Sequence, residues 1–323
     1  MNSFGRTFKI SIFGESHNEV AGVVIDGCPP GLLIKQEDFI TDLSRRKGGT
    51  RGTTGRQETD IPLLKSGIFK NHSTGSPILI IFQNKNINSE SYEKIKDTPR
   101  PSHADMVAWQ KYAGFNDYRG GGHFSGRLTV GIVAAGVIAK KILPSIKIES
   151  KIIETGENIE IAAKEGDSLG GIVECRTTGL PSGLGEPFFD SVESLLSHMV
   201  FSIPGIKGIE FGAGFACSKM KGSEYNDEIL NLEGKTKTNN SGGINGGITN
   251  GNELVFRVAV RPAASIKKPL RTVNLKTGER VKISTEGRHD ACIALRIPVI
   301  LESVTSIVMA DLKLTCKKYE YTE

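Results

Sequence analysis

The segment from Leu128 to Leu143 constrains the fold most strongly, because its side chains are apolar nearly all the way round a helix. A helix of that kind has to be buried, so the segment predicts a central helix of the core. Lys140 and Lys141 fall in its last turn, where the helix dipole favours positive charge. The stretch from Leu128 to Ala139, which reads as the longest apolar helical stretch, is too short to cross a bilayer. We therefore expect no membrane partner.

Segments with strand and helix patterns lie on both sides of this central segment. The predicted strands are Phe8–Phe13, Val20–Ile25, Pro77–Gln83 and Leu254–Val260. The predicted helices are Glu37–Lys47, His103–Tyr112, Phe189–Val200 and Val299–Lys313. Residues 144–170 read as a variable, charged connection. The pattern indicates an α+β fold with helices packed against sheets, and with no repeat or composition break we expect a single domain over residues 1–323.

The composition is that of an ordinary globular protein. The chain has 323 residues, 38% apolar and 24% charged, so disorder is not expected. Five cysteines without a CxxC pair favour neither a disulfide framework nor a zinc site. Reduced thiols and the lack of a signal-peptide pattern predict a cytoplasmic protein. The formal net charge of +5 fits an acidic small substrate and nucleic acid alike.

Four polar side chains follow the end of the first predicted strand. The run from Phe8 to Phe13 stops at Gly14, and the polar residues Glu15 to Asn18 come directly after it. Glycines stand beside His or Arg in further loops, "RRKGGTRGTTGR", "RPSHAD", "RGGGHFSGR" and "EGRHDAC". Glycine lets a backbone approach a ligand closely, and catalytic side chains favour loops on a rigid scaffold. These loops are the candidate site.

Arginine is concentrated in these loops: Arg45, Arg46, Arg51, Arg56, Arg100, Arg119, Arg127 and Arg288. The guanidinium group binds phosphate and carboxylate in a bidentate manner. A nucleic-acid site would usually add stacking aromatic residues, but aromatics make up 7% of the chain and none lies within the arginine-rich loop. The pattern favours a small polyanion and predicts no nucleic-acid partner.

Histidines are the candidate proton donors and acceptors. His17, His103 and His123 lie in the same loops, and an imidazole titrates near neutrality. Spacings typical of a metal site (HxH or HExxH) are absent, so no metal is predicted. Nucleotide-binding motifs such as GxxxxGK[ST] and GxGxxG are absent too. The glycine-rich stretch "SGGINGGITNG", from Ser241 to Gly251, is either a tight turn between strands or a loop that contacts a cofactor.

Eight motifs taken together resemble the chorismate synthase family from one end of the chain to the other. They are "FGESH" (13–17), "RRKGGTRGTTGRQETD" (45–60), "SGIFKNHSTGSPI" (66–78), "RPSHAD" (100–105), "DYRGGGHFSGRLT" (117–129), "KGSEYND" (221–227), "SGGINGGITNG" (241–251) and "GRHDAC" (287–292). The resemblance implies conversion of 5-enolpyruvylshikimate 3-phosphate to chorismate and phosphate by 1,4-elimination, in the shikimate pathway of aromatic amino acid biosynthesis. It implies reduced FMN without net redox change, a β-α-β sandwich that is not a Rossmann fold, and a homotetramer.

The resemblance also implies roles for individual residues. His17 would protonate the departing phosphate, His103 the reduced flavin, and Asp290 would relay the substrate proton. Substrate-binding positions would be Ser16, Arg46, Arg51, Arg100 and Arg127. Flavin-binding positions would be His123, Ser125, Asn240, Ser241, Gly246, Arg261, Ser265 and Arg288. This chain departs from the family's usual residues at Asn18 (Gly), Ser102 (Gly), Ala291 (Pro) and Arg261 (Lys).

Two other classes of function remain open from the sequence. One is a basic RNA-binding protein, which would bind nucleic acid and no flavin. The other is a flavin oxidoreductase, which would consume reductant in proportion to product. The sequence also leaves open whether the chain reduces FMN with NADPH, although no segment resembles a reductase and a monofunctional enzyme is expected.

Overall fold

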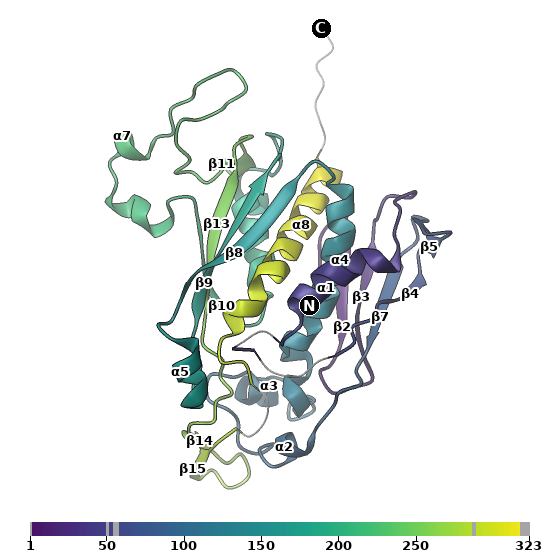
Figure 1. The fold of residues 1–323 in the computed structure, drawn as a ribbon, viewed down its shortest axis with the longest axis vertical. Helices are drawn as coiled ribbons and strands as arrows, with labels where there is room; N and C mark the ends of the chain where they lie inside the picture. The colour runs from purple at the N-terminus through teal and green to yellow at the C-terminus, as the bar shows by residue number, and fades with distance from the viewer. Residues whose placement is uncertain (1, 50–51, 54–57, 286–288, 317–323) are drawn as a thin grey trace.

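The computed structural model describes residues 2–49, 52–53, 58–285 and 289–316. Two antiparallel sheets enclose two long helices, α4 (Thr129–Ile142) and α8 (Ile297–Thr315) (Figure 1). The predicted α+β class and β-α-β sandwich are confirmed.

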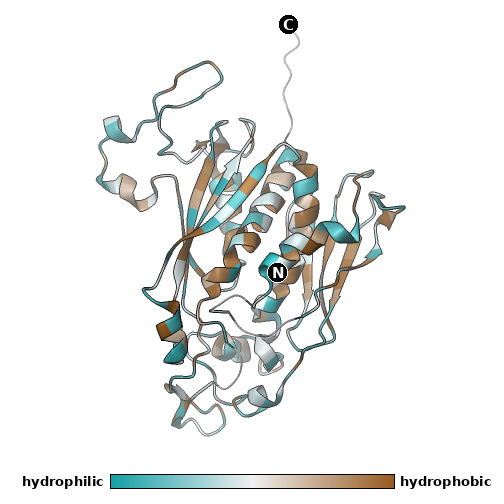
Figure 2. Ribbon diagram, in the orientation of Figure 1, coloured by the Kyte–Doolittle hydropathy of each residue, from teal (hydrophilic) through white to brown (hydrophobic). Residues whose placement is uncertain are grey.

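The first sheet is formed mainly by the N-terminal quarter of the chain. Its order is β1-β2-β3-β7-β4, with bounds Ser3–Phe4, Lys9–Gly14, Val20–Asp26, Ile78–Gln83 and Leu63–Ser66. The second sheet has the order β10-β13-β9-β8, with bounds Ile206–Phe211, Leu254–Val260, Gly171–Thr178 and Lys147–Thr155. Each sheet lays one face on the helical layer, where the hydrophobic residues of helices and strands meet (Figure 2).

Helix α4 is the predicted central helix, and 11 of its 14 residues are buried. Two glycines allow its close packing. A Cβ atom at Gly131 would lie 2.9 Å from the carbonyl oxygen of Gly22 on β3, and one at Gly136 would lie 2.4 Å from Cβ of Ser303 on α8. Neither neighbour leaves room for a side chain, so α4 touches the first sheet on one side and α8 on the other.

Helix α8 corrects one expectation, because the longest apolar helix is this one and not Leu128–Ala139. Among the described residues, one helical segment, Ile293–Thr315, is long and apolar enough to cross a membrane, but 78% of its apolar window is buried inside the protein. Its polar residues are satisfied internally, since the hydroxyls of Ser303, Thr305 and Ser306 donate to carbonyls four residues earlier. It is a core helix of the sandwich.

The other predicted elements are present with shifted ends. The helices are α1 (Ile40–Arg46), α3 (Asp105–Lys111) and α6 (Val192–Val200), joined by the shorter α2 (Glu90–Glu93), α5 (Ile159–Lys164) and α7 (Gly222–Tyr225). The glycine-rich stretch is the hairpin of β11 (Ile244–Asn245) and β12 (Ile248–Thr249), which confirms a turn between strands. Two further hairpins are β5 (Ile68–Phe69) with β6 (His72–Ser73) and β14 (Leu270–Val273) with β15 (Arg280–Ile283).

The interpretation of residues 144–170 as a connection was wrong. This stretch contains the nine-residue strand β8, paired with β9, and the helix α5. Lys147, Glu149 and Lys151 are exposed, while the half-buried residues between them, such as Ile148 and Ile152, pack against the core. The charged outer face concealed the alternation that a half-buried strand produces.

Candidate active site

Loops from distant parts of the chain meet at the end of the sandwich near α2 and α3 (Figure 1). They enclose a cavity of about 300 Å³. Six basic side chains and three acidic ones line it: Arg46, Lys47, Arg100, Arg127, Arg261 and Arg296 against Glu58, Asp60 and Asp290. The excess of positive charge suits an anionic ligand.

Arg46 and Arg127 meet at one carboxylate. Arg46 ends α1, Arg127 lies in the short turn Gly126–Leu128 just before α4, and both are buried. Nη2 of Arg46 donates to Oδ2 of Asp60 at 2.5 Å, and Nη1 of Arg127 donates to Oδ1 of the same residue. Burial alone would raise the pKa of Asp60, but the two guanidinium groups hold it below its usual value. Asp60 is therefore ionised, and this cluster of three keeps one net positive charge.

Some guanidinium N–H groups at the cavity have no partner. Nε of Arg46, Nη2 of Arg127 and Nε of Arg296 are buried and make no hydrogen bond within the described part of the chain. All three residues line the cavity. A buried donor without a partner costs free energy, typically about 1–3 kcal/mol, that a bound anion would recover.

Arg100 and His103 share a second carboxylate, that of Asp105. Arg100 donates from Nε to Oδ2 at 2.7 Å and from Nη2 to Oδ1 at 2.8 Å. Nδ1 of His103 lies 2.6 Å from Oδ1. Nη2 of Arg100 lies 3.0 Å from the same ring nitrogen, but the shorter contact to the carboxylate assigns the hydrogen to Nδ1. Burial lowers the pKa of His103 and outweighs the opposing effect of Asp105, so the imidazole is neutral at pH 7.

A turn of three consecutive glycines brings His103 and His17 together. Gly120, Gly121 and Gly122 have φ values of 60°, 82° and 54°, in the region that favours glycine. A Cβ atom at Gly120 would lie 2.5 Å from Cδ2 of His17, and one at Gly121 would lie 3.3 Å from Cε1 of His103. The two predicted catalytic histidines thus pack on adjacent residues of one turn.

His17 is held on its other sides by helix α2 and by Ser89, the residue that precedes this helix. Nδ1 of His17 lies 2.9 Å from the hydroxyl of Ser89, and its ring meets the edge of Tyr92 at a centroid distance of 5.2 Å. Ser16 and His17 are both buried, and they lie behind Gly120 and not among the lining residues of the cavity. The strand β2 therefore delivers these two residues to the edge of the site.

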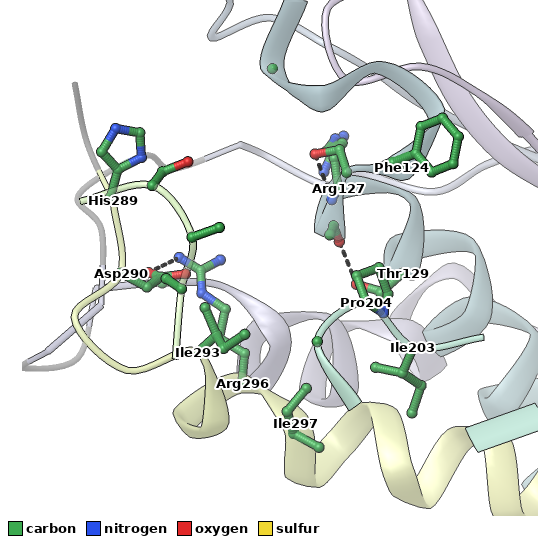
Figure 3. A pocket seen from close by; sticks show the side chains of 18 of the residues that line it. Phe124, Arg127, Thr129, Ile203, Pro204, His289, Asp290, Ile293, Arg296 and Ile297 are labelled. Atoms are coloured by element: carbon green, nitrogen blue, oxygen red, sulfur yellow. Dashed lines mark hydrogen bonds and ion pairs between the residues drawn. The ribbon is translucent and has the colours of Figure 1, made fainter. Parts of the chain in front are cut away.

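Asp290 enters the cavity from the loop before α8. Its Oδ1 accepts a hydrogen bond of 2.9 Å from Nη2 of Arg296, as Figure 3 shows. The backbone N–H of Ala291 donates to the carbonyl of Gly52 at 3.0 Å and ties this loop to the arginine-rich one. Asp290 is thus placed opposite Arg127 across the cavity, with Ile293 and Ile297 below (Figure 3).

A second cavity, of about 470 Å³, adjoins the first and shares His103, Ser125 and Arg261 with it. Apolar side chains line its far part, among them Ile10, Ile12, Leu128, Ile132 and Met199. His123 lies at its edge, with Nδ1 donating to the carbonyl of Gly14 at 2.7 Å. The two cavities together join a charged compartment to an apolar one.

The remaining predicted residues divide into three groups. Ser265 lines the first cavity, and its hydroxyl accepts from Nη1 of Arg100 at 2.9 Å. Arg51 and Arg288 lie outside the described residues. Asn240, Ser241 and Gly246 line neither cavity and lie beside β11, at the end of the molecule opposite α3 (Figure 1).

The sequence analysis did not identify three residues that the site uses. Asp60 closes the quoted motif "RQETD", Asn84 follows β7, and Arg296 belongs to the turn before α8. Asn84 accepts from Nε of Arg127 at 2.8 Å and donates to the carbonyls of Glu15 and Asn18. Asp60 could have been identified as a site residue, because it is a charged residue inside one of the quoted motifs. Arg296 lies in an otherwise apolar run, which gave no such signal. No group of three or more His, Cys, Asp or Glu side chains is placed to hold a metal ion, as far as the described ranges extend.

The family model and the similar proteins of known family all indicate the same family. The model of the chorismate synthase family matches residues 8–158 and 150–314. A chorismate synthase of Chitinophaga pinensis is 59% identical over 321 residues, which cover 97% of this chain and 97% of that protein. A chorismate synthase of Pyrococcus abyssi is 45% identical, with 95% and 96% of the two chains covered.

A solved structure agrees in fold. The structure described as "Crystal Structure of Chorismate Synthase" superposes with a TM-score of 0.74 at 24% identity, covering 96% of this chain and 93% of that one. The fold, the ordered motifs and the full-length identity agree, and the chain belongs to the chorismate synthase family.

Proposed function

We propose that the arginine-lined cavity is the site at which this chain, as a chorismate synthase, converts 5-enolpyruvylshikimate 3-phosphate to chorismate and phosphate. The observation that carries the proposal is a set of buried guanidinium N–H groups, on Arg46, Arg127 and Arg296, that have no partner within the described ranges. These arginines line a cavity that His103 and Asp290 also line. The substrate has one phosphate and two carboxylates, and charge-assisted hydrogen bonds to such groups are the strong ones.

Substrate binding falls to the basic side chains of the first cavity. Arg46, Arg100 and Arg127 are each anchored by a carboxylate, so their orientation is fixed before the substrate arrives. Fixed donors in a buried site stabilise developing negative charge without reorganisation. This supports a role in holding the departing phosphate. Arg51 belongs to the same proposal from its motif alone.

Reduced FMN fits the second cavity by the chemistry of its lining. A flavin has a flat, largely apolar ring system with polar edges, and this cavity combines many apolar side chains with His123, Ser125 and Arg261. Those three residues, with Ser265 nearby, would hold the cofactor. When bound, the electron-rich reduced flavin supplies what side chains lack for loss of a hydrogen that is not acidic.

Proton handling is assigned to His17, His103 and Asp290. Asp105 fixes the hydrogen of His103 on Nδ1 and leaves Nε2 as the atom that exchanges a proton. His17 is fixed at Nδ1 by Ser89 and packs against Gly120, which lines the cavity, and from there it would serve as the proton donor for the leaving group. Asp290 keeps one oxygen on Arg296 and accepts the substrate proton on the carboxylate.

A homotetramer supplies the residues that this cavity lacks. Asn240, Ser241 and Gly246 lie at the opposite end of the chain from the cavity (Figure 1). They contact the flavin only if a neighbouring copy brings them to it. The chain is proposed to act in the cytoplasm as one domain per copy, with no metal, nucleic acid or membrane required.

An anaerobic steady-state assay tests this function. Purified protein with the phosphate ester and reduced FMN is expected to release chorismate and phosphate in equal amounts, and a flavin titration is expected to show tighter FMN binding when substrate is present. Retardation of RNA in a gel-shift assay, with no flavin binding, would instead support the RNA-binding alternative.

A further inference from the structure

Asp60 is a buried charge for which the proposed chemistry has no direct use. Its side chain is fully buried, and it is the sole carboxylate in contact with Arg46 and Arg127 among the described residues. Two buried guanidinium groups without a counter-charge would be strongly unfavourable, so the carboxylate is needed when the site is empty.

The hydrogen bonds to Asp60 use only part of the guanidinium groups of Arg46 and Arg127. Arg46 donates from Nη2 to Asp60, and Arg127 donates from Nη1 to it. In the described part of the chain, Nε of Arg46 and Nη2 of Arg127 have no partner. Because one carboxylate binds both groups, one oxygen to each, the relative orientation of the two guanidinium groups is fixed. Both arginines line the same cavity.

The backbone at Asp60 is also held in an unusual conformation. Its φ is 50°, in the left-handed region, which costs a non-glycine residue free energy of order 1–3 kcal/mol. Asp and Asn tolerate this region better than other residues with a Cβ atom. Such a conformation persists only where the surrounding contacts determine it, and here those contacts are the two arginines.

Asn84 holds the other side of Arg127 and connects it to the loop of His17. Its Oδ1 accepts from Nε of Arg127, and its Nδ2 donates to the carbonyl of Glu15 at 3.0 Å and that of Asn18 at 2.7 Å. Arg127 is thus fixed at Nε and at Nη1, and its Nη2 has no partner among the described residues.

We propose that Asp60 is a positioning residue: its carboxylate holds Arg46 and Arg127 so that their free N–H groups converge on one anionic group of the substrate. The inference rests on the proposed function of the cavity. Both carboxylate oxygens of Asp60 are engaged by the two arginines, and it acts through them.

The variant Asp60→Asn tests this cleanly, because Asn tolerates the same backbone conformation and has the same size. An amide has no charge and only one oxygen, so it cannot offer a separate oxygen to each guanidinium group, and its NH2 group would face one of the two. The variant loses one of the charge-assisted hydrogen bonds that orient the arginines. We expect this loss to lower kcat/KM roughly 10- to 100-fold, mainly through KM.

Glu302→Gln is the matched control. Glu302 is another buried carboxylate that joins two basic side chains, with Arg45 at 2.6 Å and Lys140 at 3.4 Å, and it does not line the cavity. Its loss is expected to lower the melting temperature while kcat/KM stays near that of the wild type. An equal fall of kcat/KM in both variants would overturn the proposal.

A double-mutant cycle separates positioning from an independent role. In the Arg46→Gln/Arg127→Gln background the arginines are gone, so adding Asp60→Asn is expected to change kcat/KM less than about 3-fold, because residues in one network are not additive. The full effect of Asp60→Asn in that background would contradict an action through the arginines.

Binding of inorganic phosphate provides a readout that does not need turnover. Phosphate is expected to raise the melting temperature of the wild type and of Glu302→Gln, and to raise that of Asp60→Asn by less than half as much. An equal or larger shift in Asp60→Asn would refute the positioning role. Phosphate stabilisation that depends on Asp60, without any chorismate formation by the wild type, would refute the proposed function and leave the positioning role supported.

A charge-balanced pair covers the case in which Asp60→Asn does not fold. The variant Asp60→Asn/Arg46→Gln removes one charge of each sign and keeps the net charge of the cluster. Compared with Arg46→Gln alone, in which Asp60 still holds Arg127, it is expected to show a smaller melting-temperature shift with phosphate. Equal shifts for the two variants would count against the proposal.

Discussion

Nδ1 of His103 lies 2.6 Å from Oδ1 of Asp105. The same carboxylate accepts two hydrogen bonds from the guanidinium group of Arg100 and one from its backbone N–H. A carboxylate that binds a neutral imidazole and a cavity-lining guanidinium at once fixes both in place, so Asp105 links the proposed proton chemistry to the proposed substrate binding.

We predict that Asp105→Asn lowers kcat/KM roughly 10- to 100-fold, since an amide replaces a charged acceptor of hydrogen bonds from both partners. The measurement is steady-state chorismate formation with reduced FMN across a pH series. Asp167→Asn, which breaks an exposed pair with Lys268, is the control and should leave kcat/KM unchanged. Wild-type kinetics in Asp105→Asn would show that His103 needs no orienting carboxylate.

The pH dependence of stability follows from the lowered pKa of His103. The folded protein releases this proton more readily than the unfolded chain, so between the folded pKa and the unfolded value of about 6.5 the unfolded chain binds more protons. Stability is therefore present above about pH 6.5 and is lost as the pH falls through that window. We expect His103→Gln to flatten the fall of the free energy of unfolding as the pH drops below about 6.5. Denaturant titrations with identical pH slopes for both proteins would contradict this.

Gly120 offers a steric test of the histidine pair. Gly120→Ala would place a Cβ atom 2.5 Å from His17, at a φ of 60°. We expect it to displace His17 and to lower kcat by about 10²-fold or more, the usual contribution of a positioned acid or base. Gly278→Ala, in the turn between β14 and β15, carries the same backbone strain at a φ of 73° with nothing within 4 Å. Loss of stability without loss of kcat in both variants would mean that the position of His17 is unimportant.

Asp290 distinguishes a proton relay from a structural ion pair. Asp290→Asn still accepts from Nη2 of Arg296 but cannot take up a proton under working conditions. A relay predicts that Asp290→Asn and Asp290→Ala both lower kcat by about 10²–10⁴-fold while FMN binding persists. Near-normal turnover of a folded Asp290→Asn protein, with loss in Asp290→Ala, would leave Asp290 a structural residue. Circular dichroism checks the fold of each variant.

Much of the scaffold followed from local patterns in the sequence. Helix α4 is apolar nearly all the way round, and such a helix is stable in water only when it is buried. The sequence pattern therefore predicted the helix at the middle of the sandwich. Strand β8 was missed because its exposed lysines and glutamates dominate its composition, and its half-buried face contributes few residues. The packing of two helices between two sheets depends on contacts such as Gly136 with Ser303, which join residues far apart in the chain.

The site was partly predictable for the same reason. Motif residues such as Arg46, Arg100, Arg127 and His103 were named from the sequence and line one cavity. The partners that orient them were not named, because Asp60, Asn84 and Arg296 acquire their roles from tertiary contacts alone. Asn240 lies shortly before β11, at the end of the molecule opposite α3 (Figure 1). Nothing in the local sequence around Asn240 indicates this position, because it is set by the course of β13 and its neighbours.

Single-turnover chorismate formation under anaerobic conditions tests whether the cavity performs the proposed reaction. Enzyme with FMN reduced beforehand is mixed with one equivalent of 5-enolpyruvylshikimate 3-phosphate, and chorismate, phosphate and the flavin spectrum are followed together. The account predicts chorismate and phosphate in equal amounts, with FMN still reduced at the end and no turnover when FMN is oxidised or absent. Equal turnover with oxidised FMN or none, or oxidation of one FMN for each product formed, would contradict it.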